Sequence, residues 1–203
     1  MDTDGQPIKK KESIKYLGAL LHATGQISSE IDCKIGIANQ EFNNLQKIWK
    51  HTNMSQRRKI ELYKSLILSK FLYGLQTVWL SKALRRRIDG FYYTCLRQIL
   101  GIPHPYISRI SNKNVLRQAN DIPLHQQLLQ QQLQFYGRLM HNGEHPIHTI
   151  LQGRVVKRRP GRPHLSWKQE IDKHIQNMHL GDDDWQHPGH WRKIVRQYCS
   201  LEV

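Results

Sequence analysis

Apolar residues recur at helical spacing along most of this 203-residue chain, and that periodicity is the strongest constraint on its fold. In the first such region they follow one another at steps of three and four, which places them on one face of an α-helix. We therefore expect a long amphipathic helix over residues 29–50, with Ser29 and Asp32 as a weak capping box. Its inward stripe comprises Ile31, Ile35, Ala38, Phe42, Leu45 and Trp49.

The same pattern predicts three further helices downstream. One starts near Ser55 and runs to about Tyr73, and the next is capped at Ser81 and stops at Gly101. The third lies in "DIPLHQQLLQQQLQFYGRLMH", whose glutamines are expected to form an uncharged exposed face because the leucine periodicity continues through them. The inward-facing residues of the three helices are Ile60, Tyr63, Ile67 and Phe71; Leu84, Ile88, Phe91, Cys95 and Ile99; and Leu124, Leu128, Phe135 and Leu139.

The two ends of the chain carry different signals. Residues 8–22 predict a short β-hairpin. Near the other end, Ser166 and Gln169 form a capping box before one helix, and "HWRKIVRQYC" predicts a last short one. The inward stripes of these two helices are Trp167, Ile171, Ile175 and Met178, and Trp191, Ile194, Val195 and Tyr198. The expected fold class is mainly α: a helical bundle with a short N-terminal β-hairpin and a small helical C-terminal tail.

The formal net charge is +15, from 31 basic and 16 acidic residues, and it points to a polyanionic partner such as nucleic acid. Residues 31–100 carry most of the excess, with 13 basic against 4 acidic residues. The alternative is an ordinary solvated surface. Clustering of the cations on particular helix faces favours a polyanionic partner over an ordinary solvated surface.

The helix predicted between Ser81 and Gly101 has such a cluster. An advance of about 100° per residue places Lys82, Arg86, Tyr93 and Arg97 in one strip, together with Gly90. The cations would neutralise phosphates, the ring could stack on a base or sugar, and the glycine would let a backbone approach closely. The alternative is a solvated helix face with Tyr93 half buried.

Two other regions extend the expected cationic surface. The preceding helix aligns Arg57, Glu61 and Lys64 on its outer face. The segment "VVKRRPGRPHLSW" adds four basic residues and resembles both an AT-hook and a nuclear address, although a proline stands where hooks prefer an arginine. We interpret it as a basic linker that serves as a phosphate-contacting arm. Its four basic residues are Lys157, Arg158, Arg159 and Arg162.

The sequence shows no catalytic centre. Nucleic-acid polymerisation or cleavage usually calls for carboxylates that hold Mg²⁺, and Asp182–Asp184 read instead as a helix cap or polar loop. His141, His145 and His148 approach zinc-ligand spacing, but the Gly and Pro between them break any helix that would align them. We expect no metal, no cofactor and no catalysis by the chain alone, which leaves binding as the supported activity.

The ordered set of motifs resembles a known family. It comprises "IKYLGALL", "EIDCKIGIANQEFNNLQKIW", "SQRRKIELYKSLILSKFLYGLQTVW" and "FYYTCLRQILGI", followed by "GRPHLSW" and "HWRKIV". Together they resemble the C-terminal portion of LINE-type, non-LTR retrotransposon reverse transcriptases. The resemblance covers about residues 8–198 and rests on the order of the motifs, because none of them is very specific alone.

The resemblance implies a fold and a role. In that family a Tyr-Leu-Gly strand closes the palm, which corresponds here to Tyr16, Leu17 and Gly18, and a helical thumb, here residues 29–101, lies against the template–primer duplex. The polymerase aspartates lie upstream of Tyr-Leu-Gly in the family, and only fifteen residues precede that motif here. The implied protein is a truncated, catalytically incompetent remnant that retains sequence-tolerant binding of an RNA–DNA hybrid or an RNA or DNA duplex.

Two alternatives remain open at this stage. The chain could be a subunit or fragment of an active RNA-directed DNA polymerase that needs a separate palm and fingers polypeptide, or a non-functional relic. On the leading reading, the expected divisions are an end-of-palm β segment (1–25), a thumb-like helical domain (26–141), a basic Pro/Gly linker (142–163) and a small helical tail (164–203).

The location expected from the sequence is intracellular, nuclear or cytoplasmic. The N-terminus lacks the apolar core of a signal peptide, and no later stretch approaches the roughly 20 apolar residues that span a bilayer. We therefore expect no membrane partner.

Overall fold

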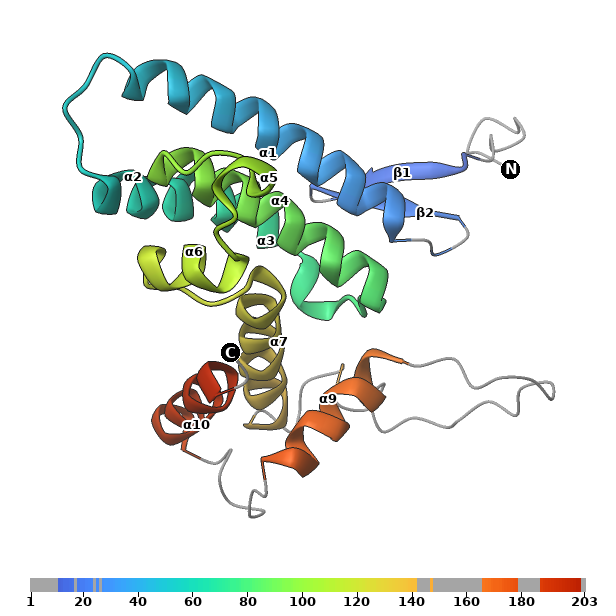
Figure 1. Ribbon diagram of the computed structural model, residues 1–203. Helices are drawn as coiled ribbons and strands as arrows, with labels where there is room; N and C mark the ends of the chain where they lie inside the picture. The colour runs from blue at the N-terminus through green and yellow to red at the C-terminus, as the bar shows by residue number, and fades with distance from the viewer. Residues whose placement is uncertain are drawn as a thin grey trace.

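The computed structural model of the chain describes residues 11–16, 18–23, 25, 27–141, 147, 166–178 and 187–201 (Figure 1). Over these residues the fold is mainly α, with one two-stranded antiparallel sheet near the N-terminus. The fold class predicted from the apolar periodicity is confirmed.

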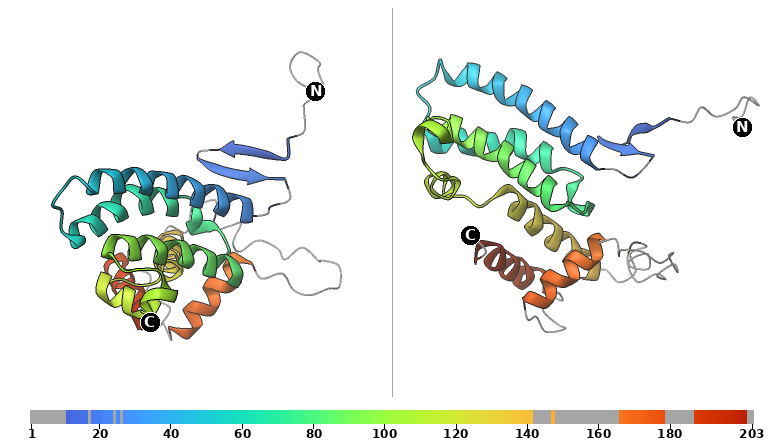
Figure 2. Two further views of the ribbon diagram at one scale, coloured as in Figure 1. Left: turned by 45° about the horizontal axis from the view of Figure 1, so that its top comes forward. Right: turned by 45° about the vertical axis from the view of Figure 1, so that its right-hand side comes forward.

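Three helical rods form the body of the protein. The first is α1 (Ser28–Trp49), the second joins α2 (Gln56–Tyr63), η1 (Lys64–Leu68) and α3 (Ser69–Leu72), and the third is α4 (Lys82–Leu100). The three rods lie side by side, and the second runs opposite to the other two (Figure 2). All the predicted inward residues of these rods are buried or partly buried in one cluster, which we call the main core.

An aromatic group at the centre of the main core ties the rods together. Phe42 of α1 meets Tyr63 of the second rod edge to face, with ring centroids 5.4 Å apart, and Tyr63 stacks on Tyr92 of α4 at 6.2 Å. Such pairs contribute about 0.5–1.5 kcal/mol beyond the area that they bury. The hydroxyl of Tyr92 donates a hydrogen bond to Asp121, which also pairs with Lys64 at 2.7 Å.

The helix starts and the second rod differ in part from the prediction. Ser81 caps α4 as predicted, and Ser55, near the predicted start of the second rod, caps α2. In contrast, α1 begins after Ile27 without a side-chain cap, so the capping box at Ser29 is wrong. The second rod is not α-helical throughout, because η1 is a π-helical segment. One wider turn shifts the register of the helix and lets Leu68 as well as the expected stripe face the main core.

The connections on both sides of α4 contain structure that the periodicity did not predict. A 3₁₀ turn, η2 (Leu75–Thr77), precedes α4, while α5 (Pro105–Ser108) and α6 (Asn112–Ala119) follow it. The last of these is capped by Ser111, whose hydroxyl accepts a hydrogen bond from the backbone of Asn114. Its apolar side adds Val115, Leu116 and Ala119 to the main core.

The glutamine-rich helix α7 (Leu124–His141) is buried on more than its leucine face. Gln126 and Gln132 are buried, so the expectation that all these glutamines form an exposed face is wrong. The amide of Gln132 donates to the carbonyl of Val78 at 2.7 Å and to that of Leu75 at 3.4 Å. It thereby ties the irregular segment around η2 to α7, adding a second donor to the carbonyl of Leu75, which also accepts from the backbone of Val78 at 3.1 Å.

The tail helices α9 (Trp167–Asn177) and α10 (Pro188–Leu201) pack against the second half of α7, as Figure 1 shows. The predicted capping box of Ser166 and Gln169 is present. A second cluster, the tail core, contains the following buried residues: Leu129, Leu133, Tyr136, Ile171, Trp191, Val195 and Cys199. Three of the seven come from α7, so the tail core is not confined to the predicted tail. Within the predicted linker, only residue 147 is described.

The predicted hairpin is present, in β1 (Ser13–Tyr16) and β2 (Ala19–His22). Gly18, with φ at +84°, lies in the turn between the strands. The whole of β1 is exposed, including Ile14 and Tyr16, and the hairpin projects beyond the helical rods (Figure 2). The part of the prediction that falls on residues 8–10 and on residue 17 lies outside the described residues.

Candidate nucleic-acid interface

The cationic strip predicted on α4 begins where that helix begins. The hydroxyl of Ser81 accepts a hydrogen bond from the backbone of Leu84 at 3.3 Å, which fixes the first turn. Lys82 and Arg86 follow one turn apart, and both are exposed. The start of the strip is therefore available to a partner.

Arg86 lies between two arginines that are used within the fold. Arg85 donates to the carbonyl of Leu80 at 3.1 Å and pairs with Glu170 of α9 at 2.5 Å. Arg87 pairs with Asp32 of α1 at 2.7 Å. Arg86 makes no ion pair with any residue that the structure describes. Its charge is therefore free to act on a partner, unlike those of its neighbours.

Tyr93 occupies the middle of the strip and is half buried. Burial, together with the nearby charge of Asp89, raises the pKa of Tyr93 to about 12. The phenol thus stays neutral at physiological pH. Asp89 itself is held by His125, whose backbone amide donates at 2.9 Å and whose ring nitrogen lies 2.6 Å from the carboxylate.

Arg97 does not belong to the exposed strip, and this part of the prediction is wrong. The residue is 5% exposed, because the segment after α4 folds back over the end of the helix. Its guanidinium donates hydrogen bonds to the carbonyls of Pro103 and Ile110 and to the side chains of Ser108 and Asn112. A cation spent on four internal acceptors is not available to a phosphate.

A hollow of about 340 Å³ opens where the strip meets this segment. Gly90 and Tyr93 line it from α4, while Ile102, His104 and Pro105 line it from the opposite wall. The sequence did not reveal this hollow, because it forms between segments whose packing depends on the internal bonds of Arg97.

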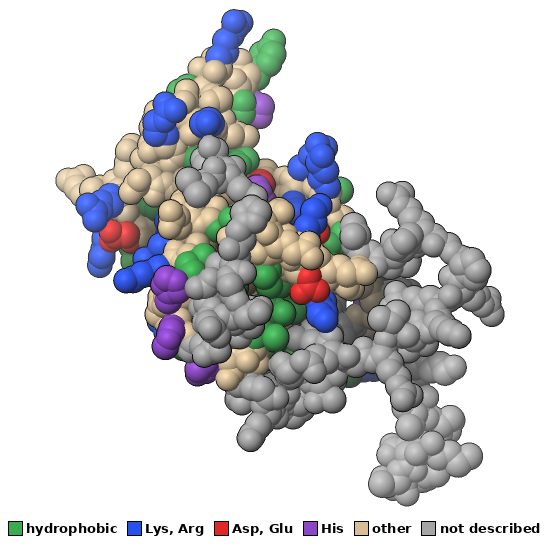
Figure 3. Space-filling model, turned by 90° about the horizontal axis from the view of Figure 1, so that it is seen from below, with side chains coloured by type: hydrophobic (Ala, Val, Ile, Leu, Met, Phe, Trp, Pro, Cys, Tyr) green, Lys and Arg blue, Asp and Glu red, His purple; other side chains and the backbone are tan. Residues whose placement is uncertain are grey.

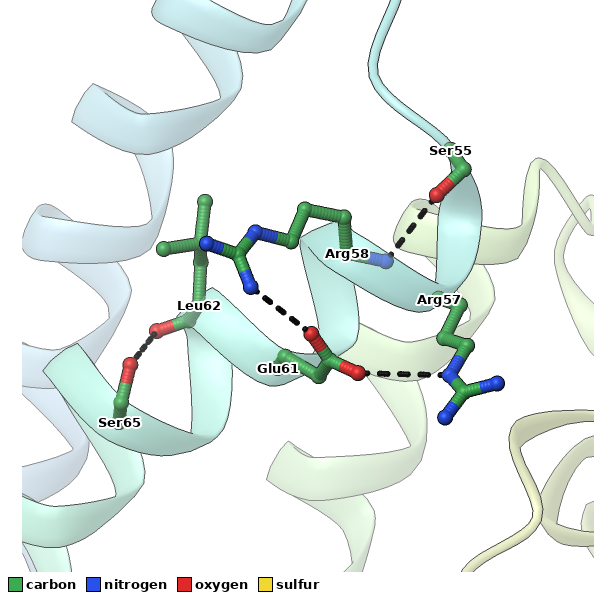
Figure 4. Close-up of polar contacts among 6 residues, drawn as sticks. All are labelled: Ser55, Arg57, Arg58, Glu61, Leu62 and Ser65. Carbon is green, nitrogen blue, oxygen red and sulfur yellow. Dashed lines mark hydrogen bonds and ion pairs between the residues drawn. The ribbon is translucent and has the colours of Figure 1, made fainter.

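The second rod contributes less free charge than predicted. Arg57 and Arg58 both donate to Glu61, at 3.3 Å and 3.1 Å (Figure 4). The hydrogen bond from Arg58, followed by that from Arg57, holds the pKa of Glu61 below its usual value despite some desolvation. Lys64 is committed to Asp121 at 2.7 Å. Both predicted cations line a groove of about 470 Å³ beside α6, but each shares its charge with a carboxylate.

Exposed cations that were not predicted lie beyond Arg97. Three exposed cations lie on α6 and just before it: Arg109, Lys113 and Arg117. Their spacing of four residues could have predicted that they share one face of a helix, although Arg109 precedes α6. Basic side chains also outnumber acidic ones on the face shown in Figure 3, where Lys and Arg are widely spread and few Asp and Glu are seen among the described residues.

Some predicted features cannot be placed. Lys157, Arg158, Arg159 and Arg162 of the basic segment lie outside the described residues, as do Asp182–Asp184. The same applies to His145 and His148. Within the described part of the chain, no three His, Cys, Asp or Glu side chains are grouped so that they could hold a metal ion.

Comparisons with known proteins found no match. The chain matches no protein-family model, no curated protein and no solved structure. None of the helices that the structure describes combines the length and apolarity needed to cross a membrane.

Proposed function

We propose that this protein binds nucleic-acid duplexes with little regard to sequence, through the N-terminal half of α4. In this proposal the three helical rods are the thumb-like part of a LINE-type reverse transcriptase, as the ordered sequence motifs suggest. An RNA–DNA hybrid is the favoured ligand, followed by RNA or DNA duplexes. The role assigned to the chain is positioning and charge neutralisation, so we propose that it is not an enzyme by itself.

The observation that supports the proposal most is the difference between Arg86 and its neighbours. Arg85 and Arg87 make ion pairs within the fold, whereas Arg86 is exposed and without an ion pair among the described residues. Lys82 lies one turn away on the same face. Neither of the two makes an ion pair with a described residue. Two such neighbouring cations on a rigid helix are suited to phosphates, whose contacts do not depend on base sequence.

The test is the salt dependence of binding. A labelled RNA–DNA hybrid is titrated with the protein at several salt concentrations, and the logarithm of the association constant is plotted against that of the salt concentration. The slope is expected to be steep and negative, because each neutralised phosphate releases counterions. Replacing Lys82 and Arg86 together by Ala should reduce the magnitude of the slope by about 2.

A matched control removes the same charge elsewhere. Lys193 and Arg196 are exposed on α10, at the other end of the molecule from α1 in Figure 1. Their double replacement by Ala should leave the slope nearly unchanged. Equal losses in both double variants would mean that only the net charge matters, and undetectable binding of the wild type at low salt would end the proposal.

A further inference from the structure

The segment after α4 presents two large apolar side chains to solvent. Tyr106 is 88% exposed and Ile107 74% exposed, both on the short helix α5. Exposed apolar residues are common singly, but here the segment that carries them is held on both sides by Arg97, which donates to the carbonyls of Pro103 and Ile110 and to the side chains of Ser108 and Asn112. Such fixing reduces the ordering cost of binding, so the segment is built to present these side chains.

The exposed pair adjoins the hollow described above. His104 and Pro105 form one wall of the hollow, and Tyr106 follows them directly in the chain. Gly90 lies on the opposite side, and a Cβ added there would meet nothing within 4 Å. Glycine in a helix interior costs roughly 1 kcal/mol relative to Ala, and packing within the described residues gives no reason for it. A hollow that is kept open in this way fits a flat ligand.

The exposed charge around the hollow is cationic, while Asp89, whose charge acts on Tyr93, is buried and held by His125. Arg109, Lys113 and Arg117 are exposed on the C-terminal side of α5, and residues 102–120 contain no Asp or Glu. On the other side of the hollow, the strip leads back to Arg86. Cations thus flank an aromatic tip and a largely apolar hollow, and this combination is typical of surfaces that bind unpaired nucleotides.

We propose that the hollow and Tyr106 bind unpaired nucleotides that continue from a duplex held on α4. One base enters the hollow beside Tyr93, the next stacks on the ring of Tyr106, and the backbone phosphates face Arg109 and Lys113. This inference rests on the proposed function, which places the duplex on the N-terminal half of α4. A protein partner would use the apolar tip but would leave the surrounding cations without a counterpart.

Three fluorescent probes test the inference: a blunt RNA–DNA hybrid, the same hybrid with a single-stranded extension, and the extension alone. The wild type should bind the extended hybrid more tightly than the blunt one. Tyr106→Ala should remove about 5- to 100-fold of affinity for the extended hybrid, the usual effect of losing one stacked base, while its affinity for the blunt hybrid stays the same. Tyr106→Phe keeps the ring and should keep the preference.

Two further variants sharpen the result. Gly90→Leu fills the hollow without meeting protein atoms near its Cβ and should also remove the preference for the extension. Tyr16→Ala is the matched control, because Tyr16 is a tyrosine that is 62% exposed on the hairpin, and it should change nothing. Retention of the preference in either Tyr106→Ala or Gly90→Leu would overturn the inference.

The failure of each proposal has its own signature. If wild-type protein binds blunt and extended hybrids equally, the inference fails while duplex binding stands. If the single strand alone binds in a Tyr106-dependent way and the blunt hybrid does not bind, duplex binding fails while the nucleotide site stands. If no probe binds at low salt, both are wrong.

Discussion

Trp191 of α10 occupies the space that a side chain at Gly137 of α7 would need. A Cβ at Gly137 would lie 2.8 Å from Cε2 of the indole, and closer still to its Nε1. The indole is 3% exposed, and its N–H donates to the carbonyl of Leu133 at 3.0 Å. This contact joins the last helix of the chain to α7, and it depends on the absence of one methyl group.

Gly137→Ala is therefore expected to destabilise the protein, by about 1–3 kcal/mol, the usual cost of overpacking. Helix propensity alone predicts the opposite, a gain of up to about 1 kcal/mol. Gly36→Ala on α1 is the control, because a Cβ there meets nothing within 4 Å. Urea unfolding monitored by tryptophan fluorescence should show opposite signs for the two variants. A stabilised Gly137→Ala would contradict the packing described here.

Arg97→Ala should cost about 2–4 kcal/mol, because it removes a buried guanidinium together with its four hydrogen bonds to the segment after α4. Arg86→Ala, one exposed arginine on the same helix, should change the free energy of unfolding by less than about 0.5 kcal/mol. Denaturant titration of both variants separates an internal cation from a free one. Similar stability of the two would show that Arg97 does not hold the segment after α4.

The three thiols should differ sharply in reactivity. Cys33 is exposed, whereas Cys95 and Cys199 are buried. Burial, only partly offset by a hydrogen bond with Tyr63, raises the pKa of Cys95 to about 12, so its reactive thiolate is scarce at pH 8. An alkylating reagent should label one thiol per folded chain and three in denaturant, as counted by mass spectrometry. Cys33→Ser should label none when folded, and rapid labelling of that variant would refute the burial.

The ion pair that joins α4 to α9 should lose its effect in acid. Burial alone would raise the pKa of Glu170, but the Arg85 guanidinium, together with the charges of His174 and Lys173, outweighs it and holds that pKa below the usual 4.5. A carboxyl whose pKa is lower in the folded than in the unfolded state stabilises the folded state at pH values above about 4.5. This contribution is lost as the pH falls from there through the folded-state pKa.

The measurement compares melting temperatures of wild type and Glu170→Gln from pH 7 to pH 3. Wild type should be the more stable at pH 7, and the gap should close toward pH 3. Glu61→Gln alters a pair on the open surface and should give only a small gap at any pH. A constant gap for Glu170→Gln would mean that the ion pair contributes nothing measurable.

Most of the fold could be predicted from local patterns in the sequence. The stripes of α1, the second rod and α4 were predicted because each helix buries one face, and periodicity reports that face directly. The caps at Ser81 and Ser166 could be predicted for the same reason, since a cap bonds to the backbone two or three residues away.

The sequence was misleading where a side chain's role depends on distant segments. Gln132 reads as solvent-facing, yet its partners are more than 50 residues away. Arg97 lies on the cationic strip by helical angle, and only the return of residues 103–112 buries it. Tyr106 and Ile107 carry no periodic pattern, because α5 is too short to show one.

The sharing of α7 between the two cores limits how the chain can be divided. Leu128 belongs to the main core and Leu129, its neighbour in sequence, to the tail core. A cut after residue 141 would strip the tail helices from Leu129, Leu133 and Tyr136 and leave these side chains facing water. The body and the tail therefore have to be kept together in evolution. Recombination within the predicted linker would separate α7 from the tail helices and leave apolar side chains of α7 exposed.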